Sequence, residues 1–148
     1  MPSSNHDAET LETLTSTLTD SIDGYEAAAN VAKPNPLAGY LRSKAQERRE
    51  VTERFRHRIA ALRGDAKVGG SVTAAAHRQF MHLKTLFQDD TKAAVEEVER
   101  GEDHLKGKFE ECMKDADLSP DTRQLITSTY DRVRFDHAQW DRLKAAQN

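Results

Sequence analysis

The sequence predicts an all-α protein: an antiparallel four-helix bundle with an extra short helix in the crossover between the second and third long helices. Three observations predict this fold. Ala, Leu, Glu, Lys, Arg and Gln recur along the 148 residues, and these residues favour helix. Apolar residues return every three or four positions, which keeps them on one helix face. Glycine and proline stand mainly between these stretches, and no alternating strand pattern appears.

The first half of the chain predicts two long helices. Residues 1–7 are expected to form a flexible leader, followed by a single domain over residues 8–148. The first apolar stripe consists of Leu11, Leu14, Leu18, Ile22, Tyr25 and Ala29. Asn35 and Pro36 supply an N-cap and a proline at the first position of the second helix, and so short a break predicts antiparallel neighbours. The second stripe consists of Leu41, Ala45, Val51, Phe55, Ile59 and Leu62. Gly64 is the expected stop.

The second half predicts the short helix and two further long ones. Ser71 can cap a helix that ends at Phe87 and carries the chain back along the bundle. The third stripe consists of Ala94, Val98, Glu102, Leu105, Phe109 and Cys112. Ser119, Pro120 and Asp121 place a cap, a proline and an acid at the start of the fourth helix. The fourth stripe consists of Ile126, Tyr130, Val133, His137 and Trp140.

The charge pattern and the single cysteine exclude several classes of function. The 22 basic and 25 acidic side chains are interleaved and leave a net charge of -3, whereas a nucleic-acid-binding protein usually has a basic face. Cys112 is the only cysteine, which favours a reducing compartment. The N-terminus lacks the basic start and apolar core of a secretion signal, and no stretch approaches the ~20 apolar residues of a membrane span. We therefore expect a cytoplasmic protein that binds neither nucleic acid nor membrane.

A polar residue stands on the apolar stripe of three long helices: Arg48 on the second, Glu102 on the third and His137 on the fourth. Burying a charge is costly unless it is paired and hydrogen-bonded. One interpretation is therefore a buried ion pair between Arg48 and Glu102, with Tyr25, Tyr130 and His137 completing its hydrogen bonds. This core polar network would have a structural role.

The alternative interpretation is a metal site, because some four-helix bundles hold two iron or manganese ions between carboxylates and histidines. The candidate ligands are Asp20, Glu99, Glu102, Asp103 and His137. No histidine has a glutamate three residues before it, so the paired Glu-x-x-His motifs of such sites are missing. Arg48 would also bring a fixed positive charge toward the ions.

Two glycines lie inside predicted helices next to these polar positions. Gly24 precedes Tyr25 and Gly101 precedes Glu102, and each glycine weakens its helix by ~1 kcal/mol relative to alanine. One interpretation is that neighbouring helices approach closely at both glycines. The other is that both stand on a solvated face without consequence.

Several segments together resemble a bacterial family of domains of unknown function. They are DSIDGYEAAA (residues 20–29), GGSVTAAAHRQFMHLK (69–84), VERGEDHLKGKF (98–109) and His137 with Trp140. Members of that family are small four-helix bundles classed as ferritin-like and related to rubrerythrins. The polar positions that match the family are Asp20, Tyr25, Arg48, His77, Glu99, Glu102, Asp103 and His137. The chain departs from it at Ala138, where the family usually has an acid.

The resemblance implies a ferritin-like bundle linked to metals or to stress responses, without fixing a reaction. Because no complete catalytic constellation is visible, the sequence favours a non-catalytic protein that acts by interaction or self-association, as a homo-dimer. The competing hypothesis is a metal-binding oxidoreductase or storage protein that holds iron or manganese. No other cofactor is expected.

Overall fold

A computed structural model describes residues 4–32, 37–64 and 91–147, and within these ranges the chain is entirely helical apart from its connections, with no strand. The helices are α1 (Ser4–Val31), α2 (Leu37–Arg63), α4 (Thr91–Met113) and α5 (Pro120–Gln147). The all-helical prediction is confirmed for this part of the chain. Asn35, Pro36 and the short helix expected from Ser71 to Phe87 lie outside the described residues.

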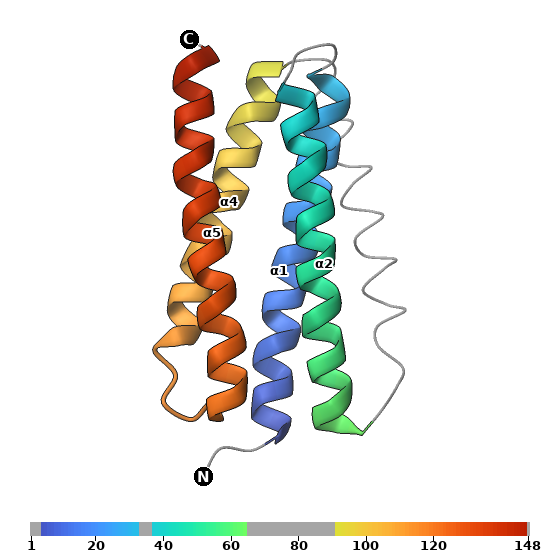
Figure 1. The fold of residues 1–148 in the computed structure, drawn as a ribbon, viewed down its shortest axis with the longest axis vertical. Helices are drawn as coiled ribbons and strands as arrows, with labels where there is room; N and C mark the ends of the chain where they lie inside the picture. The colour runs from blue at the N-terminus through green and yellow to red at the C-terminus, as the bar shows by residue number, and fades with distance from the viewer. Residues whose placement is uncertain (1–3, 33–36, 65–90, 148) are drawn as a thin grey trace.

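The four helices stand side by side along the long axis of the molecule (Figure 1). The structure packs α1 against α2 and α4, and α5 against α4 and, more lightly, α2. In Figure 1, α1 and α5 run upward and α2 and α4 run downward, so the end of α2 and the start of α4 lie at opposite ends of the bundle. None of the described helices contains an apolar run long enough to cross a membrane.

The predicted stop signal at Gly64 and the predicted start signal at Ser119 and Pro120 coincide with helix ends in the structure. Gly64 follows α2 with φ of 66°, a left-handed conformation that glycine adopts without the strain a Cβ would cause. At the start of α5, the Arg123 amide donates to the Ser119 carbonyl at 2.9 Å. Ser119 therefore caps the helix, and Pro120 occupies the first position, where no amide hydrogen is needed.

The N-terminal end of α1 differs from the expected leader, because the helix begins at Ser4. Asp7 is 1% exposed and accepts a hydrogen bond from the Ser119 amide at 3.2 Å and another from its hydroxyl. Burial alone raises the pKa of Asp7, but the hydrogen bonds from Ser119 and Thr122 outweigh it and hold the pKa below its usual value. His6 lies 2.6 Å from Asp115. These contacts hold residues 4–7 against the loop before α5.

We expect Asp7→Ala to lower the free energy of unfolding by about 1–2 kcal/mol, because the first turn of α5 loses an acceptor that acts as part of its cap. Urea unfolding followed by circular dichroism measures the change. Asn5→Ala is the matched control: Asn5 is exposed in the same turn of α1, and its replacement should change stability by less than about 0.5 kcal/mol. Equal losses in both variants would contradict the capping role.

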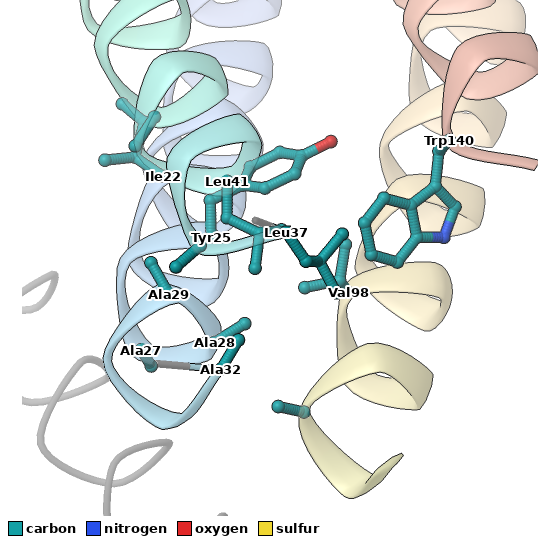
Figure 2. Packing of buried hydrophobic residues seen from close by; sticks show 13 residues of the cluster. Ile22, Tyr25, Ala27, Ala28, Ala29, Ala32, Leu37, Leu41, Val98 and Trp140 are labelled. Carbon is teal, nitrogen blue, oxygen red and sulfur yellow. The ribbon is translucent and has the colours of Figure 1, made fainter. Parts of the chain in front are cut away.

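Two apolar clusters form the core. The first lies toward the end of the bundle where α1 finishes (Figure 2). It contains Ile22, Tyr25, Ala27, Ala28, Ala29, Ala32, Leu37, Ala38, Leu41, Ala45, Ala94, Val98 and Trp140. The second contains Ala8, Leu11, Leu14, Leu18, Val51, Phe55, Ile59, Leu105, Phe109, Leu118, Ile126, Tyr130 and Val133. Along every helix the buried residues between the two sets are polar, so a charged layer divides the core.

Of the two interpretations of Gly24 and Gly101, the structure contradicts close helix approach. A Cβ added to either glycine would meet no other atom within 4 Å. Both backbones therefore face open space, and their helices do not need glycine in order to pack.

Candidate functional site

An ion pair between α2 and α4 forms the centre of the charged layer. Arg48 donates from Nη1 to one oxygen of Glu102 and from Nη2 to the other, both at 2.9 Å. The two residues are 2% and 1% exposed. Such a two-pronged contact uses the planar geometry that guanidinium and carboxylate share. Because both charges are removed from water, the pair is stable only while both partners are present.

A second buried pair connects α2 with α5. Lys44 donates to Asp136 at 2.8 Å, and Asp136 also lies 3.4 Å from the Arg48 guanidinium. Asp136 is fully buried. The apolar spacing of the sequence predicted His137 at the inward position and did not identify Asp136. Both positions fit the helical spacing between Val133 and Trp140, since steps of three and four residues can come in either order.

The charges of this layer balance. Lys44 also pairs with Glu47 at 2.9 Å, and Arg132 at the half-exposed rim contacts Glu47 and approaches Asp136 at 3.4 Å. Three cations, Lys44, Arg48 and Arg132, therefore face three carboxylates, Glu47, Glu102 and Asp136. We call these six residues the charged layer. Its balance reduces the cost of burying so many ionised groups.

Two side chains from α1, Ser21 and Tyr25, complete the layer. Ser21 accepts a hydrogen bond from Arg48 at 2.7 Å and donates to Glu102 at 3.2 Å. The Arg48 guanidinium lies 5.5 Å from the centre of the Tyr25 ring, a cation–π distance. Burial alone lowers the pKa of Arg48, but the Glu102 carboxylate outweighs it and raises the pKa above its usual value. Burial, with the charge of Glu102, likewise raises the pKa of Tyr25. Both groups therefore keep their protons at any physiological pH.

Two members of the expected network lie elsewhere. The Tyr130 hydroxyl donates to Glu110 of α4 at 2.7 Å, within the second apolar cluster. Tyr130 stands well over a turn from Asp136 on α5, so its hydroxyl reaches a different part of α4. His137 is partly exposed, and its Nε2 lies 3.8 Å from both Asp103 and Asp141. Because Asp136 takes the inward position, His137 turns to the rim between α4 and α5.

The metal-ligand candidates are not brought together. Glu102 is bound by Arg48, Asp103 is exposed beside His137, and Asp20 borders a cavity near His104. Glu99 is partly exposed and has interactions of its own. Among the described residues, no three His, Cys, Asp or Glu side chains converge in a way that could hold an ion.

A separate buried carboxylate stands between α1 and α2. Asp23 is 8% exposed, and its Oδ2 has no hydrogen-bond partner among the described residues. It borders a groove with Arg49, Arg56 and Glu26. Burial and the nearby charge of Asp20 raise the pKa of Asp23 to about 7, although Arg49 acts in the opposite direction. Asp23 therefore changes its charge near neutral pH.

The fold and the charged layer define a class: helical bundle proteins whose core is divided by buried ion pairs. Residues 7–115 of this helical bundle match a family described as "Domain of unknown function (DUF2383)". The match covers more than half of the chain, which therefore belongs to this family. No curated protein and no solved structure matches the chain.

Proposed function

We propose that this chain is a ferritin-like, rubrerythrin-related bundle of the bacterial cytoplasm in which the charged layer replaces a metal site. It acts without catalysis, by self-association, in a stress response. Support for the ferritin-like relation comes from the opposite positions of the end of α2 and the start of α4 (Figure 1). An antiparallel bundle with one long crossover between its second and third long helices has this arrangement.

The observation that carries the proposal is the double hydrogen bond between Arg48 and Glu102. Both carboxylate oxygens accept from the guanidinium at 2.9 Å and in that arrangement are not available to a metal ion. Arginine also stays charged and repels a divalent ion at close range. The donor set in the bundle centre therefore does not fit a pair of iron or manganese ions.

Metal uptake tests this proposal directly. Protein purified without chelator and mixed anaerobically with ferrous or manganous ions should hold less than about one-tenth of an equivalent, because binding would have to break the buried ion pair. Elemental analysis after desalting gives the content. Uptake of one or two equivalents that is lost in Glu102→Gln would overturn the proposal in favour of a metal-dependent protein.

A second candidate function, a metal-binding oxidoreductase or storage protein, is favoured by one observation at the rim. His137 Nε2 lies 3.8 Å from a carboxylate of Asp103 and from one of Asp141. In the structure these three groups do not converge on an ion, so this candidate requires side-chain movements that bring them together. Uptake that is lost in His137→Ala but kept in Glu102→Gln would support this candidate and place its ion at the rim.

Self-association is proposed to use the exposed side of α5. Phe135 is the exposed large apolar side chain of the described residues, at 51%, and Arg132 lies over its ring with 5.2 Å to the centroid. An aromatic flanked by arginine is typical of the residues that dominate protein interfaces. We therefore place Phe135 in the contact between two copies.

We expect the chain to sediment as a dimer and Phe135→Glu to weaken dimerisation by about 2 kcal/mol or more, the loss typical of a central interface residue. Sedimentation over a range of concentrations measures the change. Arg54→Glu is the control, because Arg54 is exposed on α2 and should leave the dimer intact. A monomer at high micromolar concentration in the parent protein contradicts the proposal.

A further inference from the structure

A cavity of about 270 Å³ lies between α1 and α4, beside the charged layer. Thr17, Asp20 and Gly24 line it from α1, and Val98, Gly101 and His104 line it from α4. Ser21 and Glu102 reach it from within, so the cavity connects the buried ion pair with the surface. Its volume is near the lower limit of about 300 Å³ for small-molecule pockets.

The two helix-interior glycines keep this cavity open. Gly24 and Gly101 stand on facing helices and both border it. A Cβ at either position would meet no atom within 4 Å, so helix packing does not account for glycine there. Glycine is otherwise unfavourable inside a helix. Glycine at these two positions leaves free space in front of partly exposed backbone.

One charge at the cavity is left without a partner. Glu102 is neutralised by Arg48, and Glu97 pairs with Arg100. Asp20 is exposed at the mouth of the cavity and makes no ion pair or hydrogen bond within the described residues. Partial burial raises its pKa, although His104 lies near enough to lower it. A carboxylate at the open side of a cavity can bind a cation that brings its own hydrogen-bond donors.

The surroundings favour an organic cation over a metal ion. Asp20 and His104 belong to no group of three ligands among the described residues, whereas an ion bound by protein alone needs several. Val98 and the two glycines offer apolar surface next to the carboxylate. We propose that this cavity binds a small aliphatic amine, with its ammonium group on Asp20 and its carbon chain along Gly24, Gly101 and Val98. This site is independent of the self-association surface on α5.

The test uses butylammonium, with 1-butanol as the uncharged probe of equal shape. Titration followed by amide chemical shifts should give saturable binding of butylammonium at about 1–10 mM, as expected for so small a ligand. The shifts should be centred on residues 17–24 and 97–104. Asp20→Asn should weaken binding at least about tenfold, because the charge-assisted contact is lost. Gly101→Leu should abolish it by filling the cavity.

Alanine replacements separate binding from folding. Gly101→Ala should raise Tm by about 3 °C through helix propensity and still weaken binding. Gly107→Ala is the matched control, because Gly107 is also a helix glycine in open space but stands outside this cavity; it should raise Tm and leave binding unchanged. Absence of saturation with butylammonium, or equal affinity for 1-butanol, overturns the proposal. So does unchanged binding in Asp20→Asn.

Discussion

Arg48→Ala is expected to lower the free energy of unfolding by about 3–5 kcal/mol, the loss typical of removing one partner from a buried ion pair. Glu102 is 1% exposed and receives two hydrogen bonds from Arg48. Without the guanidinium, Glu102 would keep the hydrogen bond from Ser21 but lose both charge-assisted ones. Urea unfolding at neutral pH measures the loss, provided that the variant is compared at equal protein concentration.

Two further variants show whether burial causes the effect. Arg63→Ala removes the partner of Glu12 in an exposed pair and should cost less than about 1 kcal/mol. Arg48→Met combined with Glu102→Leu replaces both charges by apolar groups and should lose less stability than Arg48→Ala alone. If the double variant is less stable than Arg48→Ala, the buried ion pair contributes more stability than the apolar replacements, and its role in the core has to be reconsidered.

The second large effect concerns Asp23, whose replacement by asparagine should stabilise the protein at alkaline pH. The folded-state pKa is raised from 3.8 to about 7, so the folded chain binds this proton more tightly than the unfolded chain. The stability that the protonated group contributes is fully present below pH ~3.8 and is lost as pH rises through ~7. Each pKa unit corresponds to ~1.4 kcal/mol. Allowing for water in the groove, we expect Asp23→Asn to gain about 2 kcal/mol near pH 8.

The pH dependence makes this prediction specific. The gain from Asp23→Asn should shrink steadily as pH falls from about 8 to about 4, because the parent side chain becomes neutral as well. Charged groups border the groove from both helices: Glu26, Arg49, Glu53 and Arg56. They are present in both proteins, so the part of their titration that is independent of Asp23 cancels in the comparison. A gain that stays constant over this range would show that asparagine acts through packing or hydrogen bonding and not through charge.

The sequence was sufficient to predict Arg48 and Glu102 as partners because each interrupts an apolar stripe that is otherwise regular. Asp136 could not be identified in this way: it precedes His137, both fit the spacing from Val133 to Trp140, and only the rotation of α5 decides between them. The structure places Asp136 fully buried and His137 partly exposed. Periodicity therefore locates a helix face to within about one residue, and side chains that differ by one position can exchange roles.

Contacts between distant segments were beyond prediction for a different reason. The hydrogen bonds from Ser119 to Asp7 join residues far apart in the sequence, and no local pattern records which helix end will lie beside which loop. The polar start of the chain predicts a loose leader on composition alone, because the partner that orders Asp7 is known only once the bundle is assembled. The cavity between α1 and α4 could not be predicted from the sequence either, because a glycine inside a helix can indicate close packing or open space.

The charged layer has a practical consequence for any shortened form of the chain. The family match ends at residue 115, yet Asp136 on α5 holds Lys44 and lies beside Arg48. A recombinant fragment trimmed to that match would lose Asp136, the fully buried partner of Lys44, and Asp7 would lose the serine that it binds. We therefore expect the smallest unit that folds by itself to include α5, which lies beyond the residues that match the family.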